Sequence, residues 1–350
     1  MKPNYCIRHI AIIVIGINCI VFPFCHSKSK KENCITAAAT DAKAACVMEQ
    51  STRRILYESC GDSRLPIAST TKIATAITVL ESCQDIEEKV EIPSIAEGIE
   101  GSSVYLKKGE IYTVKDLLYG LMLRSGNDCA VALADSCGGM RQFIKKMNIT
   151  AQKAGAFHTN FHNPHGLPHK KHYSTAHDLC LITCYALQNH IFREIVSTQY
   201  YEARHWKNKN KMLYQYEGAM GVKTGYTKEA GRCLVSAAQR EGMALVCTVL
   251  NSPNMYEYSM ELLDDAFHHY HNYKVVDKNE YFSIPNNEKI KGYTKKDIFY
   301  PLLPEEVPFI HRKVVPVNYA VSPDENGQIV GQIQIYLSKC LIFSENLYKL

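Results

Sequence analysis

Acidic side chains are missing from the first 31 residues of this 350-residue chain, although Lys2, Arg8, Lys28, Lys30 and Lys31 lie there. The first carboxylate is that of Glu32, so the formal net charge of +5 comes entirely from the N-terminus. Residues 32–350 contain 35 basic and 35 acidic side chains and have no excess of either sign. A nucleic-acid-binding domain normally carries a basic excess on its folded part. Nucleic acid is therefore excluded as an expected partner.

Long apolar runs are also scarce, and the main one is residues 10–24, with the sequence IAIIVIGINCIVFPF. As a helix this run would be about 22 Å long, short of the roughly 30 Å hydrocarbon core of a bilayer. A basic start followed by a short apolar run is typical of a secretory signal. No small-x-small cleavage site is obvious, so residues 1–31 are interpreted as either a signal peptide or an uncleaved N-terminal anchor in the membrane. Both interpretations predict an exported, extracytoplasmic protein associated with the cell wall or the membrane.

The 14 cysteines include no paired CxxC spacing, which excludes a zinc ribbon. A chain of this length needs no disulfide framework, so most cysteines are predicted to be small buried hydrophobic residues, with one or two disulfides left open. Six histidines crowd into residues 158–177, but their spacing matches no zinc motif; they are His158, His162, His165, His169, His172 and His177. The sequence therefore predicts neither a metal site nor a cofactor.

The hydrophobic content of 46% and charged content of 21% are typical of a globular protein, and the patterning predicts an α+β fold. Apolar residues recur at helical spacing over residues 67–83, 113–123, 128–137, 142–154, 175–189 and 260–270. Strands are predicted as a hairpin within residues 45–58, and then over residues 219–223, 232–239, 244–250 and 328–337, the last entered from an Asn326-Gly327 turn. After about residue 274 the chain shows only short strand-like runs. We therefore predict a domain of residues 32–274 and a small β-rich C-terminal domain of residues 275–350.

The tetrapeptide Ser69-Thr70-Thr71-Lys72 is the first candidate motif. Residues three apart on a helix share a face, so the Lys72 amine can reach the Ser69 hydroxyl. A serine is a poor nucleophile until a base takes its proton. A lysine can act as that base only when it is neutral, which requires burial or a nearby cation. The apolar surroundings of the motif favour burial.

Two further motifs follow, each with an ordinary structural alternative. Ser125-Gly126-Asn127 places a hydroxyl and a carboxamide between two predicted helices, where a helix cap is the commoner use of such residues. Lys223-Thr224-Gly225 ends a predicted strand, where lysine and threonine can hold a carboxylate and glycine allows close approach. In this order, SxxK, SxN and KTG form the motif set of serine acyltransferases.

On these motifs the chain resembles the low-molecular-mass penicillin-binding proteins that are serine-type D-alanyl-D-alanine carboxypeptidases, over most of residues 44–340. Other stretches that carry the match are IASTTK (67–72), GEIYTVKDLLYGLMLRSGNDCAVALA (109–134), Met147-Asn148, FHNPHGL (161–167) and GVKTGYTKEAG (221–231). The resemblance implies a penicillin-recognising transpeptidase/β-lactamase-like catalytic domain, with a helical subdomain beside a mostly antiparallel sheet. It also implies a small β-rich C-terminal domain.

The resemblance implies that the protein removes the terminal D-Ala from peptidoglycan stem pentapeptides and is inhibited by β-lactams. Ser69 would attack the substrate carbonyl, with Lys72 as the general base. Ser125 would pass a proton to the departing D-Ala amine, and Asn127 would hold the substrate amide and orient Lys72.

The third motif would bind the substrate in this scheme. Lys223 and Thr224 would hold the terminal carboxylate, and Gly225 would let the substrate lie close to the strand. The backbone N–H groups of Ser69 and Tyr226 would form the oxyanion hole.

The sequence departs from the family in three places. Residues 251–260 (NSPNMYEYSM) contain no arginine, where many relatives place one near the substrate carboxylate. A basic amphipathic helix that many relatives use to lie on the membrane is not found between the last strand and Leu350. Cys129 stands where a small alanine is usual.

Two alternatives are weighed against the carboxypeptidase. A β-lactamase needs a carboxylate to activate the deacylating water, and no Glu–Asn pairing of that kind lies between Ser125 and Lys223. A non-catalytic penicillin-sensing or cell-wall-binding protein would be expected to carry a damaged motif, whereas all three motifs are intact.

Overall fold

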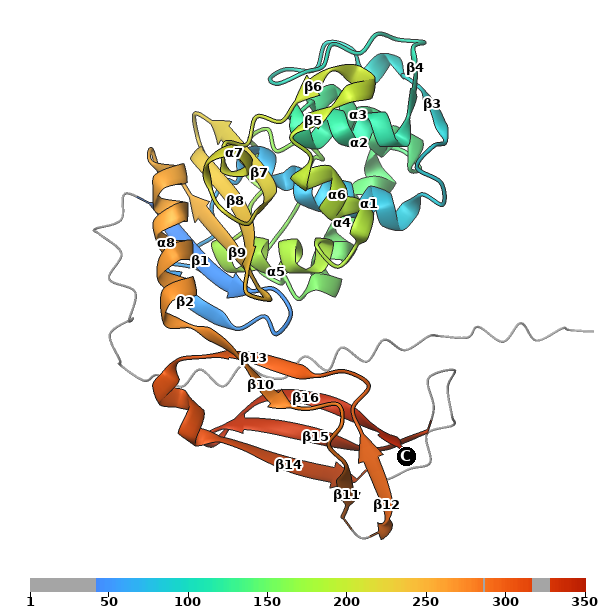
Figure 1. The fold of residues 1–350 in the computed structure, drawn as a ribbon. Coiled ribbons are helices and arrows are strands. Elements are labelled where there is room, and N and C mark those ends of the chain that lie inside the picture. The colour runs from blue at the N-terminus through green and yellow to red at the C-terminus, as the bar shows by residue number, and fades with distance from the viewer. Residues whose placement is uncertain (1–41, 286, 317–327) are drawn as a thin grey trace, which may run out of the picture. The chain divides into compact units, whose positions relative to one another are not determined.

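The computed structural model describes residues 42–285, 287–316 and 328–350 (Figure 1). The expected N-terminal signal or anchor and the expected Asn326-Gly327 turn lie outside these residues. Within the described ranges, no helix is both long enough and apolar enough to cross a membrane.

A five-stranded antiparallel sheet forms the centre of the larger domain. Its order is β2 (Ile55–Ser59), β1 (Ala44–Glu49), β9 (Met243–Leu250), β8 (Gly231–Arg240) and β7 (Ala219–Thr227). Every residue of β1 is buried, because helices cover both faces of the sheet. The expected hairpin of β1 and β2 and the expected strands β8 and β9 are confirmed.

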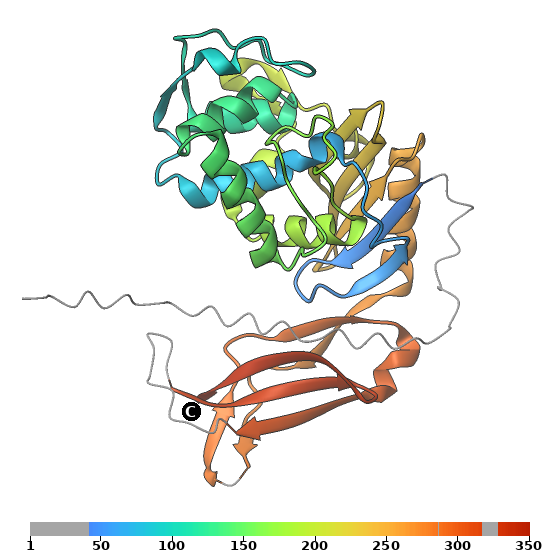
Figure 2. The same cartoon turned by 180° about the vertical axis from the view of Figure 1, so that it is seen from behind.

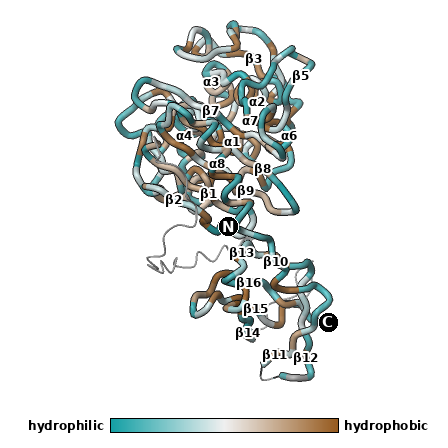
Figure 3. The backbone as a smooth tube through the Cα atoms, turned by 60° about the vertical axis from the view of Figure 1, so that its left-hand side comes forward, coloured by the Kyte–Doolittle hydropathy of each residue, from teal (hydrophilic) through white to brown (hydrophobic). Residues whose placement is uncertain are grey.

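Helix α8 (Met255–His269) and the short α7 (Met212–Gln215) pack on one face of this sheet, while α5 (Ala176–Ala186) and the remaining helices lie on the opposite side (Figures 1 and 2). Alternate residues of β1 point to opposite faces, as a strand requires. Cys46 and Met48 pack into the core on the helical side, whereas Val47 packs on the α8 side. The hydropathy of the chain follows this arrangement, since apolar residues mark the buried strands β1 and β9 (Figure 3).

The helical subdomain is built from six of the described helices, joined by short turns and by two long connections over residues 83–113 and 155–175. These helices are α1 (Lys72–Ser82), α2 (Val114–Leu123), α3 (Asn127–Ser136), α4 (Met140–Ala154), α5 and α6 (His190–Ser197). Two hairpins accompany them, β3 (Lys89–Glu91) with β4 (Ile111–Thr113), and β5 (Tyr200–Tyr201) with β6 (Trp206–Lys207). Thr113 starts α2 with a capping box, in which its hydroxyl accepts from the N–H of Asp116 at 3.0 Å.

Two expected helices have different boundaries in the structure. The expected helix over 67–83 begins as a 3-10 helix at Ala68–Thr71 and becomes α-helical only at Lys72. The hydroxyl of Thr70 donates to the backbone carbonyl of Ile67 at 2.6 Å. The expected helix over 175–189 ends at residue 186, because Asn189 is the cap of a separate helix, α6, whose first N–H groups it accepts.

Strand β7 and helix α8 are also longer than expected. The strand continues through the KTG motif to Thr227, since residues 222–227 all pair with β8. Helix α8 begins at Met255, five residues earlier than expected, because Met255, Leu262 and Ala266 continue one buried face. Both errors concern elements that tertiary packing extends beyond the local apolar pattern.

The C-terminal residues form a separate β arrangement with its own buried cluster, which gathers side chains from residues 275–347. Its five-stranded antiparallel sheet has the order β11 (Phe282–Ile284), β12 (Asn287–Tyr293), β16 (Cys340–Lys349), β15 (Ile329–Leu337) and β14 (Ile310–Pro316), and β10 (His271–Val276) pairs with β13 (Ile298–Leu302). The short 3-10 helix Pro304–Phe309 precedes β14. The expected strand before Leu337 is confirmed as β15.

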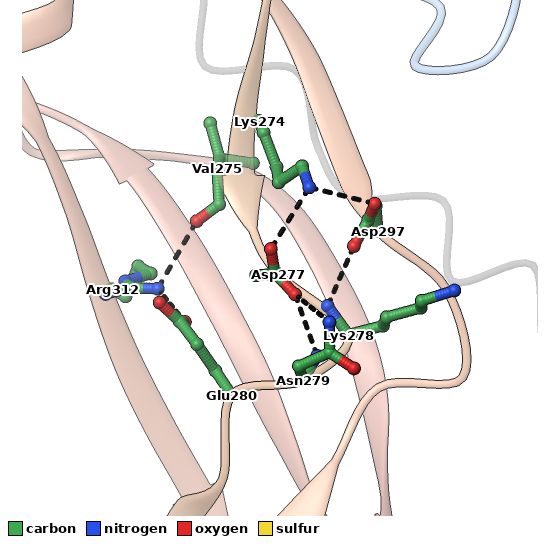
Figure 4. Close-up of polar contacts among 8 residues, drawn as sticks. All are labelled: Lys274, Val275, Asp277, Lys278, Asn279, Glu280, Asp297 and Arg312. Atoms are coloured by element: carbon green, nitrogen blue, oxygen red, sulfur yellow. Dashed lines mark hydrogen bonds and ion pairs between the residues drawn. The ribbon is translucent and has the colours of Figure 1, made fainter.

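Charged side chains close the turn that follows β10 (Figure 4). The Nζ atom of Lys274 lies 3.0 Å from an oxygen of Asp277 and 3.0 Å from an oxygen of Asp297. Arg312 of β14 pairs with Glu280 beside them. Since Lys274 occupies the space between the two carboxylates, this acidic group stabilises the turn and is no candidate ligand site.

The structure describes ten of the cysteines. Six of them are buried, namely Cys46, Cys129, Cys180, Cys184, Cys233 and Cys247. Their role in this part of the chain is the expected one of small hydrophobic residues.

Candidate active site

Ser69 and Lys72 meet at the junction between the 3-10 helix and α1. The Nζ atom of Lys72 lies 2.8 Å from the Oγ atom of Ser69, 2.6 Å from Oδ1 of Asn127 and 2.9 Å from the backbone oxygen of His165. Ser69 is half-buried, whereas the side chain of Lys72 is completely buried. The first and second motifs are therefore joined through a single amine.

The ionisation of Lys72 is shifted in the direction that a base requires. Burial lowers the pKa of Lys72 well below its ordinary value, and the nearby cation Lys223 lowers it further. The carboxylate of Asp128 and the thiol of Cys129 act in the opposite direction and only partly offset these effects.

The SGN motif lies between α2 and α3, with Ser125 buried at a left-handed φ of +64°. Asn127 is held from two sides by the loop that precedes it in the chain. Its N–H donates to the carbonyl of Ser102 at 2.7 Å, and its Nδ2 donates to the carbonyl of Glu100 at 2.6 Å. The Oδ1 atom is consequently the end of the carboxamide that faces Lys72.

The KTG motif lies on β7, an edge strand next to Ser69. A Cβ atom on Gly225 would stand 2.9 Å from the backbone nitrogen of Ser69, so glycine allows the strand to come this close. Lys223 is buried, and burial together with the cation Lys209 lowers its pKa to about 7. Thr224 is half-buried and the side chain of Tyr226 is exposed.

Sequence reasoning missed three contributors to this site. The carbonyl of His165 accepts from Lys72, but a backbone acceptor leaves no signal in side-chain chemistry. Lys209 acts on Lys72 and Lys223 through charge, although the sequence indicated only a polar, basic surface stretch there. Asp128 follows the SGN motif, and its carboxylate binds the loop that holds Asn127. An acidic residue within an apolar helix is a sequence signal that could have suggested this role.

The structure also shows where the departures from the family pattern lie. Arg232 stands on β8 directly opposite Tyr226, and its guanidinium carbon is 5.9 Å from the centre of that ring. The N–H of Ser252, in the segment without arginine, donates to the carbonyl of Arg232 at 3.0 Å. Cys129 is fully buried against the SGN turn, and burial raises the pKa of its thiol.

The histidine-rich stretch is a loop up to residue 175, and His177 lies on α5. The loop packs against Ala68, directly before Ser69. His162 and His169 stack with their ring centres 3.5 Å apart. Among the described residues, no group of three or more His, Cys, Asp or Glu side chains is arranged to hold a metal ion.

Comparison with known proteins decides the family of this chain. The family model described as D-alanyl-D-alanine carboxypeptidase, peptidase family S11, matches residues 30–254. The chain belongs to this family. The three motifs Ser69–Lys72, Ser125–Asn127 and Lys223–Gly225 all lie within the matched residues.

Relatives of the S11 family agree over most of the chain. The D-alanyl-D-alanine carboxypeptidase DacF of Bacillus subtilis is 28% identical over 355 residues, which cover 93% of this chain and 89% of that protein. The D-alanyl-D-alanine carboxypeptidase of Streptomyces sp. strain K15 is 37% identical over 245 residues, which cover 63% of this chain and 84% of that protein.

Solved structures of the family show the same fold. Penicillin-binding protein 5 from Haemophilus influenzae superimposes with a TM-score of 0.75 at 25% identity, covering 90% of this chain and 98% of that chain. The Streptomyces K15 DD-transpeptidase superimposes with a TM-score of 0.63 at 35% identity, covering 67% and 100%. The expected fold and the expected serine-type D-alanyl-D-alanine carboxypeptidase activity are thereby confirmed.

Proposed function

We propose that this carboxypeptidase removes the terminal D-Ala from peptidoglycan stem pentapeptides through an acyl-enzyme on Ser69, and that β-lactams acylate the same serine. The observation that carries this proposal is the buried Lys72 amine, 2.8 Å from the Ser69 hydroxyl. A buried amine with a lowered pKa is neutral over more of the pH range and can accept a proton.

The three partners of Lys72 support its role as the base. Two of them, Oδ1 of Asn127 and the carbonyl oxygen of His165, accept hydrogen bonds. A neutral amine has two N–H groups, which these two acceptors use. Its lone pair then faces Ser69, whose hydroxyl proton it would take as the serine oxygen attacks the carbonyl of the penultimate D-Ala.

The remaining steps are assigned to groups around the nucleophile. The N–H groups of Ser69 and Tyr226 would bind the oxyanion of the tetrahedral intermediate. Ser125 would pass the proton held by Lys72 to the amine of the departing D-Ala, which leaves an ester on Ser69. Water then hydrolyses this ester, and the serine recovers its proton.

The KTG strand would bind the substrate. Lys223 in its protonated form and the hydroxyl of Thr224 would hold the terminal carboxylate of the peptide, and Asn127 would hold its amide. Gly225 leaves room for the substrate backbone beside β7. A β-lactam carries a strained carbonyl and a carboxylate that fit the same groups.

We also propose that residues 32–274 form the catalytic domain and residues 275–350 a small β-rich domain. The separate buried cluster within residues 275–347 supports this division. Since peptidoglycan lies outside the cytoplasmic membrane, the enzyme would act there. Residues 1–31 would direct its export, as a signal peptide or as an N-terminal membrane anchor.

Labelling with a fluorescent penicillin tests the proposed nucleophile. The wild type is expected to bind the label covalently, and Ser69→Ala is expected to bind none. Ser136→Ala, an exposed serine on α3, is the matched control and should label like the wild type. Equal labelling of Ser69→Ala would refute the assignment.

Product analysis then separates the related activities. Release of one D-Ala per pentapeptide, with slow turnover of penicillin, is expected for the carboxypeptidase. Rapid penicillin hydrolysis would instead indicate a β-lactamase, and labelling without D-Ala release would indicate a penicillin-sensing protein.

A further inference from the structure

The histidine-rich loop supplies the underside of the nucleophile turn. The carbonyl of Pro164 accepts from Thr75 of α1 at 2.6 Å, and a Cβ atom on Gly166 would stand 1.9 Å from the carbonyl oxygen of Ala68. The loop therefore touches the residue directly before Ser69. One imidazole of the loop, that of His172, makes a contact that the proposed mechanism does not use.

His172 is only 5% exposed, and both of its ring nitrogens have partners within the protein. Nδ1 accepts a hydrogen bond from the backbone N–H of His162 at 3.1 Å, and Nε2 lies 2.8 Å from Oγ1 of Thr71. A neutral imidazole has one N–H. Because Nδ1 is the acceptor, the proton is on Nε2 and is donated to Thr71.

This tautomer persists across the neutral pH range. Burial, with smaller contributions from neighbouring histidines, lowers the pKa of His172 to about 3. The groups near the ring are the backbone N–H of His162, the hydroxyl of Thr71, the ring of Phe161 and the imidazoles of His165, His162 and His169. No carboxylate is among these contacts, so the described surroundings offer nothing to favour a charged imidazole.

The hydroxyl of Thr71 links His172 to the peptide bond between Ala68 and Ser69. It accepts from His172 and donates its own hydrogen to the carbonyl of Ala68 at 2.8 Å. That carbonyl and the N–H of Ser69 belong to one planar trans peptide and point in opposite directions. The direction of the carbonyl therefore fixes the direction of the Ser69 N–H.

This peptide needs such support. Ala68 has a left-handed φ of +46°, which is unfavourable for a residue with a side chain. On the opposite side of the peptide, the nitrogen of Ser69 faces β7 at Gly225. The peptide plane is thus held between Thr71 on one side and the KTG strand on the other.

We propose that His172 is a positioning residue, which acts through Thr71 and the Ala68 carbonyl to aim the Ser69 N–H at the oxyanion of the reacting carbonyl. The proposal rests on the proposed function, in which that N–H is half of the oxyanion hole. His172 would thus support acylation by positioning a backbone N–H, and not by binding a metal ion with the other histidines of the loop.

Two matched pairs of variants test this arrangement. Thr71→Val removes the hydroxyl while it keeps the shape, and Thr71→Ser keeps the hydroxyl. His172→Asn keeps the acceptor near Nδ1 but loses the donor to Thr71, whereas His172→Gln places an amide donor near the position of Nε2. The measurements are the rate constant of acylation by a fluorescent penicillin and the inhibition constant of a boronic acid that forms a tetrahedral adduct with Ser69.

The expected results differ within each pair. Thr71→Val and His172→Asn should slow acylation by about 10- to 100-fold, somewhat less than outright removal of an oxyanion donor, and should weaken boronate binding by a similar factor. Thr71→Ser and His172→Gln should stay within about threefold of the wild type, since the hydrogen-bonded chain is preserved. The pH of half-maximal acylation should not move in any of the four variants, because Lys72 is untouched.

Several outcomes would overturn the proposal. Acylation of Thr71→Val at the wild-type rate would do so, as would equal losses in both members of each pair or a shift of the pH profile. If the His172 variants do not fold, as judged by circular dichroism, the Thr71 pair decides alone. Failure of the wild type to label at Ser69 would instead refute the proposed function, so the two failures are distinguishable.

Discussion

The Nζ atom of Lys72 lies 2.8 Å from the Oγ atom of Ser69 while the lysine side chain is fully buried. An ammonium group at such a position loses its hydration, which is why burial is the main cause of the lowered pKa of Lys72. The same desolvation that makes the amine a base also links the stability of the fold to pH.

The first prediction is that wild-type stability rises with pH relative to Lys72→Met. The sign follows from proton binding. Between the lowered pKa of Lys72 in the folded state and its ordinary pKa in the unfolded state, only the unfolded chain binds the extra proton. The free energy of unfolding then rises by up to about 1.4 kcal/mol per pH unit, and this dependence disappears below the folded-state pKa.

Urea unfolding of both proteins between pH 6 and pH 9.5 measures this effect. The quantity of interest is the wild-type free energy of unfolding minus that of Lys72→Met at each pH. A difference that stays flat over the whole range would mean that Lys72 is charged in the native protein, and Lys72 would then be unsuited to act as the base.

The second prediction concerns Lys209, whose charge lowers the pKa of both Lys223 and Lys72. Lys223 must be protonated to hold a carboxylate, so kcat/KM should fall as pH rises above the Lys223 pKa of about 7. Lys72 must be neutral to act as the base, so kcat/KM should rise with pH as Lys72 loses its proton, at a pH below the ordinary lysine range. Lys209→Met removes a cation near both groups and should move both limbs to higher pH.

The pH profile of D-Ala release from a pentapeptide checks this prediction. The two limbs should move in the same direction, because the lost charge acts on two lysines. A profile that changes only in height would show that Lys209 contributes contacts and not charge.

The site could be predicted from the sequence where side chains form it, and could not where backbone atoms or distant residues form it. Ser69, Lys72, Asn127 and Lys223 belong to motifs whose side chains have recognisable chemistry, and the structure brings these motifs together. The carbonyl of His165 is a backbone group that any residue could supply. Lys209 lowers the pKa of Lys72 and Lys223 because it lies near them in space, and no local sequence pattern records that proximity.

The fold shows the same division. Strands such as β1 could be predicted because their apolar residues are continuous. The 3-10 helix at Ala68–Thr71 could not, because the sequence there looks helical, and Thr71 bonds to the distant His172, a contact that no local pattern records. Asn189 misled the helix assignment because asparagine does not itself reveal whether it ends one helix or caps the next.

The third prediction compares two glycines with similar backbone angles. Gly166 has a φ of +90° and its added Cβ would clash with the Ala68 carbonyl, whereas Gly109 has a φ of +82° and open space around it. Gly109→Ala should cost only the backbone strain, about 1 kcal/mol. Gly166→Ala should cost several kcal/mol and should slow acylation at Ser69 by about 100-fold or more, because the backbone before the nucleophile must move.

Thermal unfolding and the acylation rate of the two variants provide the comparison. Since the φ penalty is common to both, the difference between them isolates the clash. Equal stability and equal acylation rates would contradict the close packing of the histidine-rich loop under Ser69.

The fourth prediction is that Asp128→Asn releases the loop that holds Asn127. The Asp128 carboxylate is 1% exposed and accepts from the hydroxyl of Ser103 at 2.6 Å, the N–H of Val104 at 3.0 Å and the N–H of Leu106 at 3.1 Å. All three bonds go to Oδ2, while Oδ1 accepts from the N–H of Cys129 at 2.9 Å, so the NH2 group of an asparagine would face a backbone donor in either orientation.

The expected loss of stability is about 2 kcal/mol or more, because hydrogen bonds to a buried charged acceptor are lost. Acylation should also slow, since the same loop holds Nδ2 of Asn127 through the carbonyl of Glu100. Asp135→Asn, an exposed carboxylate on the same helix α3, is the matched control and should change stability by less than about 0.5 kcal/mol. If both variants unfold at the same urea concentration and acylate equally fast, Asp128 does not hold the loop, and Asn127 must be oriented by Lys72 alone.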